Sequence, residues 1–442
     1  MYSQVSTPHY LPSIERIENI YAVLNKTSIK NNFKICHFGD SHIQGDRITG
    51  EIRNNLQGLG GNGGNGKFFP YSLCKSYGPL GTNSSIIGNY SFATILKNPQ
   101  NYSIGPLGYT IIMEDSAEFS IVFDDQFRGK RSNKFTILTN ENGDTNSIVL
   151  LSSGKLLEKL KIDDQMYKYT FISDDIPTLI KFKVLKTFGF LSIEFINDKG
   201  LSYEQCGVVG AQFTHLVMHS KEILSVLKNQ EPNLIIFSYG TNESYDNIDS
   251  IYYENMITNF IEEVKATIPN TALLITNSPD TRSGGRTPKS ELLINRVLAR
   301  IAERTSISHL DINKAMGGWG SQSKWQAGDL FSKDQLHFNT KGATLMGKII
   351  SWALFKGCNL DDSVTLHLEN EIFRAMPTDS LNLPKYTLEI KNNSAKYNVY
   401  TVKQGDTLLS IANKLKTTVK RLCEVNKILE PNKIQAGKKL RY

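Results

Sequence analysis

A switch in sequence pattern, from mixed helix and strand to strand alone and back again, most constrains the fold of this chain. Before residue 81 and after residue 201, short strand-like runs alternate with segments of helical periodicity, as in the buried parallel strands and covering helices of an α/β domain. We expect one such domain, assembled from residues 13–81 and 201–357. The predicted strands are 33–38, 234–237, 272–275 and 308–311, and the predicted helices are 11–25, 47–56, 291–303 and 340–355.

The intervening segment, residues 82–200, has the pattern of an antiparallel β-sandwich. Apolar and polar side chains alternate along several short runs, and Asn, Asp and Gly turns separate these runs. Examples are 119–123, 134–138, 180–184 and 189–195. We interpret the segment as an all-β module inserted into the α/β domain. Residues 358–397 are expected to form a linker to a last segment, residues 398–442.

The last segment carries the whole charge excess of the chain. The 442 residues include 50 Lys and Arg against 43 Asp and Glu, and ten of the basic but only three of the acidic residues lie between 398 and 442. The rest of the chain is balanced. This distribution argues against a nucleic-acid-binding body and favours a neutral main part with a small basic appendage.

Cysteine spacing and hydropathy exclude further classes of protein. The five cysteines are scattered without a CxxC pair, so a zinc ribbon or redox motif is not expected, and we predict that they are buried as small apolar residues. No apolar stretch reaches the 18 residues that a membrane span needs, and the N-terminus lacks a secretory signal. The Gly-rich tract 58–67 looks like a phosphate loop but follows a predicted helix, so no nucleotide is expected there.

A serine follows the first predicted strand at a place suited to catalysis. The segment Phe38-Gly-Asp-Ser-His42 would bring Ser41 to the carboxyl end of a parallel strand, where open α/β sheets bind ligands. Such a serine can be a nucleophile if a base accepts its proton. The segment is not a GxSxG elbow, because Ile43 replaces the last glycine. Taken alone, Gly-Asp-Ser is also a common turn.

Two later segments supply partners for this serine. The second predicted strand ends in Gly-Thr-Asn242, which puts a side-chain amide at the same sheet edge, and Asp334-Gln-Leu-His337 precedes the last helix. The i, i+3 spacing lets the Asp334 carboxylate accept the Nδ1 proton of His337 while Nε2 faces the serine, as a hydrolytic triad requires. Asp329 lies too far from His337 along the chain for this local pairing.

Ser41, Asn242, Asp334 and His337, in this order, resemble the SGNH (GDSL-type) hydrolase family. The resemblance implies a three-layer α/β/α fold, a Ser41–His337–Asp334 triad, and no metal or organic cofactor. It also implies an oxyanion hole formed by the Ser41 amide, the Asn242 side chain and the amide of a glycine. Gly210 matches that glycine best, and Gly207 is the alternative.

The wider context resembles the bacterial peptidoglycan O-acetylesterases of this family. The similarity rests on residues 39–50, the inserted β-module and the segment 317–325, and it spans residues 33–350. It implies a carbohydrate-binding-module-like insert and a serine esterase that removes O-acetyl groups from peptidoglycan, at the 6-position of N-acetylmuramic acid, through an acetyl-enzyme. The alternatives are an acetylesterase for a xylan-like or chitin-like polysaccharide or for a lipid, and an inactive glycan-binding protein.

Residues 398–442 closely resemble a LysM domain, a βααβ module that binds glycans containing N-acetylglucosamine. The resemblance rests on residues 400–412 and 434–442, and it implies paired strands at 400–402 and 439–441 and a first helix over 407–415. The implied glycan contacts are Gly405, Asp406, Thr407, Pro431 and Ile434. Together the resemblances imply a monomeric enzyme of the cell envelope, periplasmic or secreted, whose signal peptide has been removed.

Several other residues have reactive or aromatic side chains, but no neighbouring motif assigns a function to them. His37 is expected to pack along its strand, and His215 and His219, four residues apart on a helix, lack a third metal ligand. Trp319, Trp325 and Arg286 are open to two interpretations, as sugar-binding residues or as core and surface residues.

Overall fold

The structure is a computed structural model that describes residues 11, 13–98, 102–127, 129–141, 143, 145–286, 288, 290–377, 399–415, 417, 419, 422, 426, 428 and 434–441. The chain divides into two compact units, residues 1–378 and 379–442, and each unit has its own buried apolar core. Within the described ranges, no helix is both long enough and apolar enough to cross a membrane.

The first unit contains a five-stranded parallel sheet in the order β13-β1-β14-β15-β16. Its strands are β1 (Phe33–Gly39), β13 (Leu201–Gly207), β14 (Leu234–Ser238), β15 (Ala272–Thr276) and β16 (Ser308–Leu310). The four predicted strands are therefore confirmed to within one residue at each end. Because β1 lies between β13 and β14, its carboxyl end is flanked by the carboxyl ends of both neighbours.

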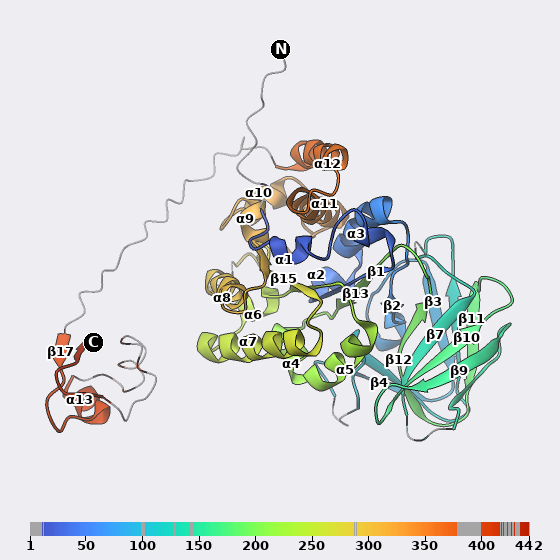
Figure 1. The fold of residues 1–442 in the computed structure, drawn as a ribbon, viewed down its shortest axis with the longest axis horizontal. Helices are drawn as coiled ribbons and strands as arrows, with labels where there is room; N and C mark the ends of the chain where they lie inside the picture. The colour runs from blue at the N-terminus through green and yellow to red at the C-terminus, as the bar shows by residue number, and fades with distance from the viewer. Residues whose placement is uncertain are drawn as a thin grey trace, which may run out of the picture. The chain divides into compact units, whose positions relative to one another are not determined.

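Helices cover both faces of this sheet, which gives the expected three-layer arrangement (Figure 1). Side chains of a strand point alternately to opposite faces, and β14 follows this rule. Its Ile235 and Phe237 belong to the apolar cluster that contains α5 (Ser220–Gln230), α7 (Ser250–Thr267) and α8 (Glu291–Arg304). Its Leu234 and Ile236 belong to the cluster that contains α3 (Arg47–Gly60) and α11 (Thr340–Gly357).

Two antiparallel sheets lie between β1 and β13 in the sequence. One follows the order β4-β5-β12-β7-β10-β9 with β2 paired to β12, and the other follows the order β3-β6-β11-β8. Phe119 of β6 packs against Phe190 of β12, with 5.3 Å between the ring centroids, so side chains of the two sheets share one core. This arrangement is compatible with the predicted β-sandwich, whose limits at 82 and 200 stay a prediction. The strands are β2 (Lys67–Phe68), β3 (Thr82–Ile87), β4 (Tyr90–Thr94), β5 (Tyr109–Met113), β6 (Glu118–Phe123), β7 (Lys134–Asn140), β8 (Ile148–Leu150), β9 (Lys155–Lys161), β10 (Met166–Ile172), β11 (Leu179–Val184) and β12 (Phe188–Phe195).

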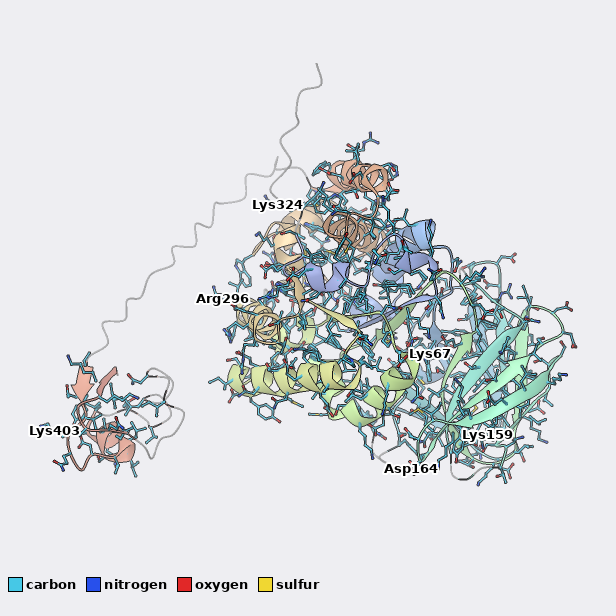
Figure 2. The ribbon with its side chains drawn as sticks, viewed as in Figure 1. Lys67, Lys159, Asp164, Arg296, Lys324 and Lys403 are labelled. Atoms are coloured by element: carbon cyan, nitrogen blue, oxygen red, sulfur yellow. The ribbon has the colours of Figure 1, made fainter. Side chains whose placement is uncertain are left out.

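A buried lysine lies where the antiparallel and parallel sheets meet (Figure 2). Lys67 of β2 contacts Glu194 of β12 at 3.8 Å and Glu204 of β13 at 3.5 Å. The Lys67 amide also donates a 3.0 Å hydrogen bond to the Glu204 carboxylate. Since a buried charge is tolerated only when it is paired, this cluster fixes the seven-stranded sheet against the edge strand of the parallel sheet.

Two expectations about helices are corrected. The predicted helix at 11–25 is reduced to α1 (Glu18–Tyr21), because Glu15 instead forms a backbone bridge with His309 beside β16. The predicted linker does not begin at residue 358, because Asp361 caps a further helix, α12 (Asp362–Ala375). Leu368 and Ile372 of α12 are buried in the same apolar cluster as α11, so this helix belongs to the first unit.

The second unit has the strand pairing expected of the LysM resemblance. Strands β17 (Val399–Thr401) and β18 (Lys439–Arg441) are antiparallel, with Tyr400 opposite Leu440. The first helix, α13 (Leu408–Lys414), is capped by Thr407, whose hydroxyl accepts the Ser410 amide at 3.1 Å. The second helix of the predicted βααβ order falls largely outside the described residues.

Candidate active site

The turn between β1 and α2 (Ser41–Gln44) presents the predicted nucleophile at the carboxyl end of β1, which lies between β13 and β14. Asp40 caps α2 by accepting the His42 amide at 2.9 Å, and Ser41 is the first residue of the helix, so its own amide needs no partner within the helix. The turn is tight. A Cβ on Gly39 would meet the Ile43 side chain and would lie 2.7 Å from the Ser238 carbonyl oxygen, so only glycine fits there.

Ser41, His337 and Asp334 lie in one hydrogen-bonded series, although 296 residues separate the first two. Ser41 Oγ lies 2.8 Å from His337 Nε2, and His337 Nδ1 lies 2.7 Å from Asp334 Oδ2. The other carboxylate oxygen, Oδ1, accepts the amides of Leu336 and His337, each at 3.0 Å. Partial burial opposes ionisation of Asp334, but these hydrogen bonds outweigh it and hold the pKa of the carboxyl below its ordinary value of 3.8. Asp334 is therefore a fixed anion that orients the imidazole.

A second histidine links the nucleophile turn to the loop that carries His337. The His42 ring nitrogens lie 3.1 Å from Asp40 Oδ1 and 3.1 Å from the Leu336 carbonyl oxygen. Burial disfavours the charged ring, but Asp40 and the Leu336 carbonyl outweigh burial and raise the pKa of His42 above 6.5. His42 is thus a positioning residue. One of its acceptors, Asp40, lies two residues away, but the other, the Leu336 carbonyl, comes from a distant segment that the local sequence does not reveal.

The predicted oxyanion donors follow the two strands that flank β1. Gly39 is opposite Gly207 of β13 on one side and Ser238 of β14 on the other, so Ser41, Gly210 and Asn242 all follow adjacent strand ends. Gly210 lies in a turn with φ +79°, and no acceptor for its amide is found among the described residues. The Asn242 side chain donates to the Ala211 carbonyl oxygen at 2.8 Å, which joins the two donor segments.

Gly207, the alternative glycine, has a packing reason to be glycine. It is the last residue of β13, and a Cβ on it would collide with the backbone of Gln44 in α2. Gln44 in turn accepts the Val209 amide through its side chain at 2.7 Å. Gly207 therefore lets the nucleophile helix approach β13, and Gly210 remains the better candidate for the donor.

Glu243 is a buried residue to which the sequence assigns no role. It hydrogen-bonds to both segments that carry predicted oxyanion donors. Glu243 accepts the Phe213 amide at 2.7 Å, the Gly240 amide at 3.0 Å and the Tyr253 hydroxyl at 2.9 Å. Burial is the largest influence on this carboxyl and raises its pKa to about 7, although the hydrogen bonds from the Phe213 amide and the Tyr253 hydroxyl act in the opposite direction. The only local signal is its position directly after Asn242.

We expect Asn242→Ala to lower kcat for acetyl ester hydrolysis by about 10²- to 10³-fold, because removal of one oxyanion donor has an effect of this size. KM should change little, since the donor acts on charge that develops in the transition state. Steady-state rates with 4-nitrophenyl acetate would measure both constants. A kcat within threefold of wild type would remove Asn242 from the oxyanion hole.

An open cavity of about 250 Å³ adjoins the triad. Ser41 and His337 contribute to its lining, together with Arg47, Tyr77, Ser332 and Phe338. A cavity of this size, with the nucleophile at its wall, can admit an acetyl group and part of the alcohol to which it is esterified.

The other reactive residues lie in ordinary structural surroundings. His37 is buried between the Tyr203 and Ser238 hydroxyls, and burial lowers its pKa to about 3. Asp329 pairs with Lys341 at 2.6 Å rather than with His337. His215 and His219 have no third metal ligand within the described ranges. Cys36, Cys74, Cys206 and Cys358 are buried, as predicted, and form no disulfide, and Cys423 lies outside the described residues.

The two tryptophans considered as sugar-binding residues, Trp319 and Trp325, differ in exposure. Trp325 is 0% exposed and donates to the Met316 carbonyl oxygen at 3.0 Å, so it is a core residue and not a sugar-binding one. Trp319 is 37% exposed, and Arg286 is exposed as well. A sugar-binding role for Trp319 or Arg286 stays a prediction.

Three of the predicted LysM contacts, Gly405, Asp406 and Thr407, lie on the loop between β17 and α13. Asp406 accepts the Tyr400 hydroxyl at 2.9 Å and the Lys403 amide at 2.8 Å, which closes the loop around Gly405. Hydrogen bonds to the Lys403 amide and the Tyr400 hydroxyl lower the pKa of Asp406. Ile434 packs against the small core of this unit, whereas Pro431 lies outside the described residues.

Comparisons with known proteins identify two families in the chain. Residues 192–345 match the GDSL-like lipase/acylhydrolase family, and residues 400–441 match the LysM domain. Among curated proteins, the endolysin of Bacillus phage B103 is 41% identical over 63 residues, which are 14% of this chain and 23% of the endolysin. The chain thus spans about a quarter of the length of that relative.

The comparison with solved structures supports the fold through one alignment with a TM-score above 0.5. A peptidoglycan O-acetylesterase aligns with a TM-score of 0.61 and 20% identity, over 78% of this chain and 96% of that one. The esterase EstA from Pseudoalteromonas sp. aligns with a TM-score of 0.29 and 14% identity, over 36% of this chain and 79% of that one. The chain therefore contains a GDSL-like lipase/acylhydrolase domain with the fold of a peptidoglycan O-acetylesterase, followed by a C-terminal LysM domain.

Proposed function

We propose that this protein is a serine esterase that removes O-acetyl groups from peptidoglycan, at the 6-hydroxyl of N-acetylmuramic acid. The observation that carries the proposal is the hydrogen-bonded series from Ser41 through His337 to Asp334 beside an open cavity. The substrate assignment draws on the fold shared with a peptidoglycan O-acetylesterase and on the LysM domain in the same chain. These features also favour a location at the cell wall.

The geometry supports a two-step acyl transfer. Ser41 Oγ attacks the acetyl carbonyl carbon while His337 Nε2, 2.8 Å away, takes the hydroxyl proton. The amides of Ser41 and Gly210 and the Asn242 side chain stabilise the oxyanion that forms. His337 then returns the proton to the sugar oxygen as the carbon–oxygen bond breaks. In the second step water attacks the acetyl-Ser41 ester, His337 takes a proton from that water, and acetate leaves as Ser41 is reprotonated.

The substrate is tested by acetate release from three polymers under identical conditions. We expect wild-type protein to release acetate from O-acetylated peptidoglycan and much less from acetylated xylan or acetylated chitin. Peptidoglycan whose esters have been removed by mild alkali is the blank. Activity confined to xylan or chitin would contradict the substrate assignment while leaving the esterase chemistry intact.

The LysM unit is expected to hold the enzyme on the polymer without taking part in the reaction. Deletion of residues 398–442 should lower binding to insoluble peptidoglycan by about tenfold or more, because two linked binding modules gain from effective concentration. The same deletion should leave 4-nitrophenyl acetate hydrolysis within twofold, since residues 1–378 form a compact unit of their own. Pull-down and activity assays measure the two quantities, and equal pull-down of both proteins would contradict the role of this unit.

A further inference from the structure

Two side chains in the wall of the active-site cavity have no part in the triad or the oxyanion hole. Arg47 is the first residue of α3, and Tyr77 follows the short helix η2 (Tyr71–Cys74). Both line the cavity that contains Ser41 and His337. Any sugar whose ester reaches Ser41 must pass close to them.

The charge of Arg47 is not used within the protein. Arg47 is exposed, and no carboxylate within the described ranges forms an ion pair with it. Its neighbour Asp46 forms an ion pair with Arg53 at 2.6 Å and accepts a hydrogen bond from the Thr49 hydroxyl, also at 2.6 Å. A cation on the first turn of a helix opposes the helix dipole, so folding stability does not explain why an arginine occupies this position.

Tyr77 presents an aromatic ring that is fixed at one end. Its hydroxyl donates to the Ser41 carbonyl oxygen at 3.2 Å, and its ring lies over Gly45, where an added Cβ would be 3.3 Å from Tyr77 Cε2. The residue is nevertheless 49% exposed. An anchored aromatic ring with an open face can bind an apolar surface at little cost in conformational entropy, and the flat face of a pyranose ring offers such a surface.

We propose that Arg47 and Tyr77 form a subsite that selects an acetylated sugar bearing a carboxylate. The Tyr77 ring contacts the pyranose, and the Arg47 guanidinium pairs with an anionic group carried by the same residue of the glycan. Muramic acid supplies that group as its lactyl carboxylate where no peptide is attached, or through the carboxylates of the peptide where the lactyl group is amidated. The subsite rests on the proposed function and deepens it, because neutral acetylated polymers have no group for Arg47 to bind.

The first test compares Arg47→Gln with wild type on O-acetylated peptidoglycan fragments and on 4-nitrophenyl acetate, which carries no carboxylate. We expect kcat/KM to fall about tenfold on the fragments, as for loss of a charge-assisted hydrogen bond at a partly solvated site, and less than threefold on the neutral ester. The loss on fragments should appear in KM. Added salt should raise the wild-type KM for fragments and change that of Arg47→Gln less.

Two variants serve as controls. Arg47→Lys keeps the charge and should recover part of the lost affinity, although it cannot form the bidentate pair. Arg296→Gln removes the same charge from the exposed face of α8 (Figure 2) and should keep the wild-type preference for fragments. Amidase-treated glycan strands, which carry a free lactyl carboxylate in place of the peptide, identify the source of the anion. For a lactyl carboxylate, the effect of Arg47→Gln is found on these strands and not on peptide-bearing fragments, and for a peptide carboxylate the reverse holds.

The ring is tested by a pair of Tyr77 variants. Tyr77→Phe and Tyr77→Leu both lose the hydroxyl bond to Ser41, but only the leucine loses the ring, so only Tyr77→Leu should raise KM for fragments severalfold. Equal KM values for the two variants would overturn the role of the ring, and equal losses for Arg47→Gln on fragments and on the neutral ester would overturn that of the arginine. If wild type released no acetate from peptidoglycan, the proposed function itself would fail, which is a distinguishable result.

Discussion

We expect Ser41→Ala to lower kcat for acetyl ester hydrolysis by at least about 10⁴-fold, the size of loss seen when a triad nucleophile is removed. The Ser41 hydroxyl is the group that faces His337 Nε2 at 2.8 Å, and Ser41 follows β1 at the sheet edge where its neighbours β13 and β14 also end. No other hydroxyl of the described residues is recorded in contact with His337 Nε2. The rates with 4-nitrophenyl acetate and with O-acetylated peptidoglycan should fall together, because both esters require the same acyl transfer.

Ser332→Ala is the matched control for this variant. Ser332 lines the same cavity, and its amide donates to the His337 carbonyl oxygen at 2.8 Å, a backbone bond that alanine keeps. Its hydroxyl has only a 3.5 Å contact with the Phe338 carbonyl oxygen. We expect less than a threefold change in kcat. A Ser41→Ala protein that retained more than a tenth of wild-type activity, with an unchanged melting temperature, would exclude Ser41 as the nucleophile.

The elements that carry the site were predictable because each is marked locally. The strand at Phe33–Gly39 is an apolar run that ends in Gly-Asp-Ser, and the strand at Leu234–Ser238 ends in Gly-Thr-Asn. Asp334 and His337 are three residues apart, so their pairing needs only a local turn. The sequence thus reveals the reacting groups, whereas the 296-residue separation between Ser41 and His337 is closed by a fold that had to be inferred by resemblance.

The features that escaped prediction depend on partners from distant segments. From the sequence alone, Glu204 is a charged residue with no evident partner in the edge strand β13. In the structure it pairs with Lys67, which lies 137 residues earlier in the chain. The bridging role of His42 requires the Leu336 carbonyl, 294 residues away. Helix α12 is the exception, since Asp361 and the spacing of Leu368 and Ile372 are local helix signals that a linker does not need.

Asp334→Asn is expected to lower kcat by about 10³- to 10⁴-fold with little change in KM, because it reverses the tautomer of His337. In the wild type, Oδ2 of Asp334 accepts a hydrogen bond from Nδ1–H and leaves Nε2 free to accept from Ser41. An asparagine can keep the Oδ1 position, which accepts the Leu336 and His337 amides, so the loop should hold its shape. Its NH₂ group would then face Nδ1, which favours the tautomer with the proton on Nε2, and that tautomer cannot take a proton from the serine.

We also expect Asp334 to add no pH dependence of its own to the reaction. Since the pKa of Asp334 lies below 3.8 in the folded protein, the carboxylate stays ionised at every pH above that value. The wild-type pH profile should therefore show no inflection from Asp334 between about pH 5 and pH 9. Asp329→Asn, which removes the same charge from a surface pair with Lys341, should lower kcat less than twofold. If instead Asp329→Asn abolished activity and Asp334→Asn stayed within tenfold of wild type, Asp334 would not be the residue that orients His337.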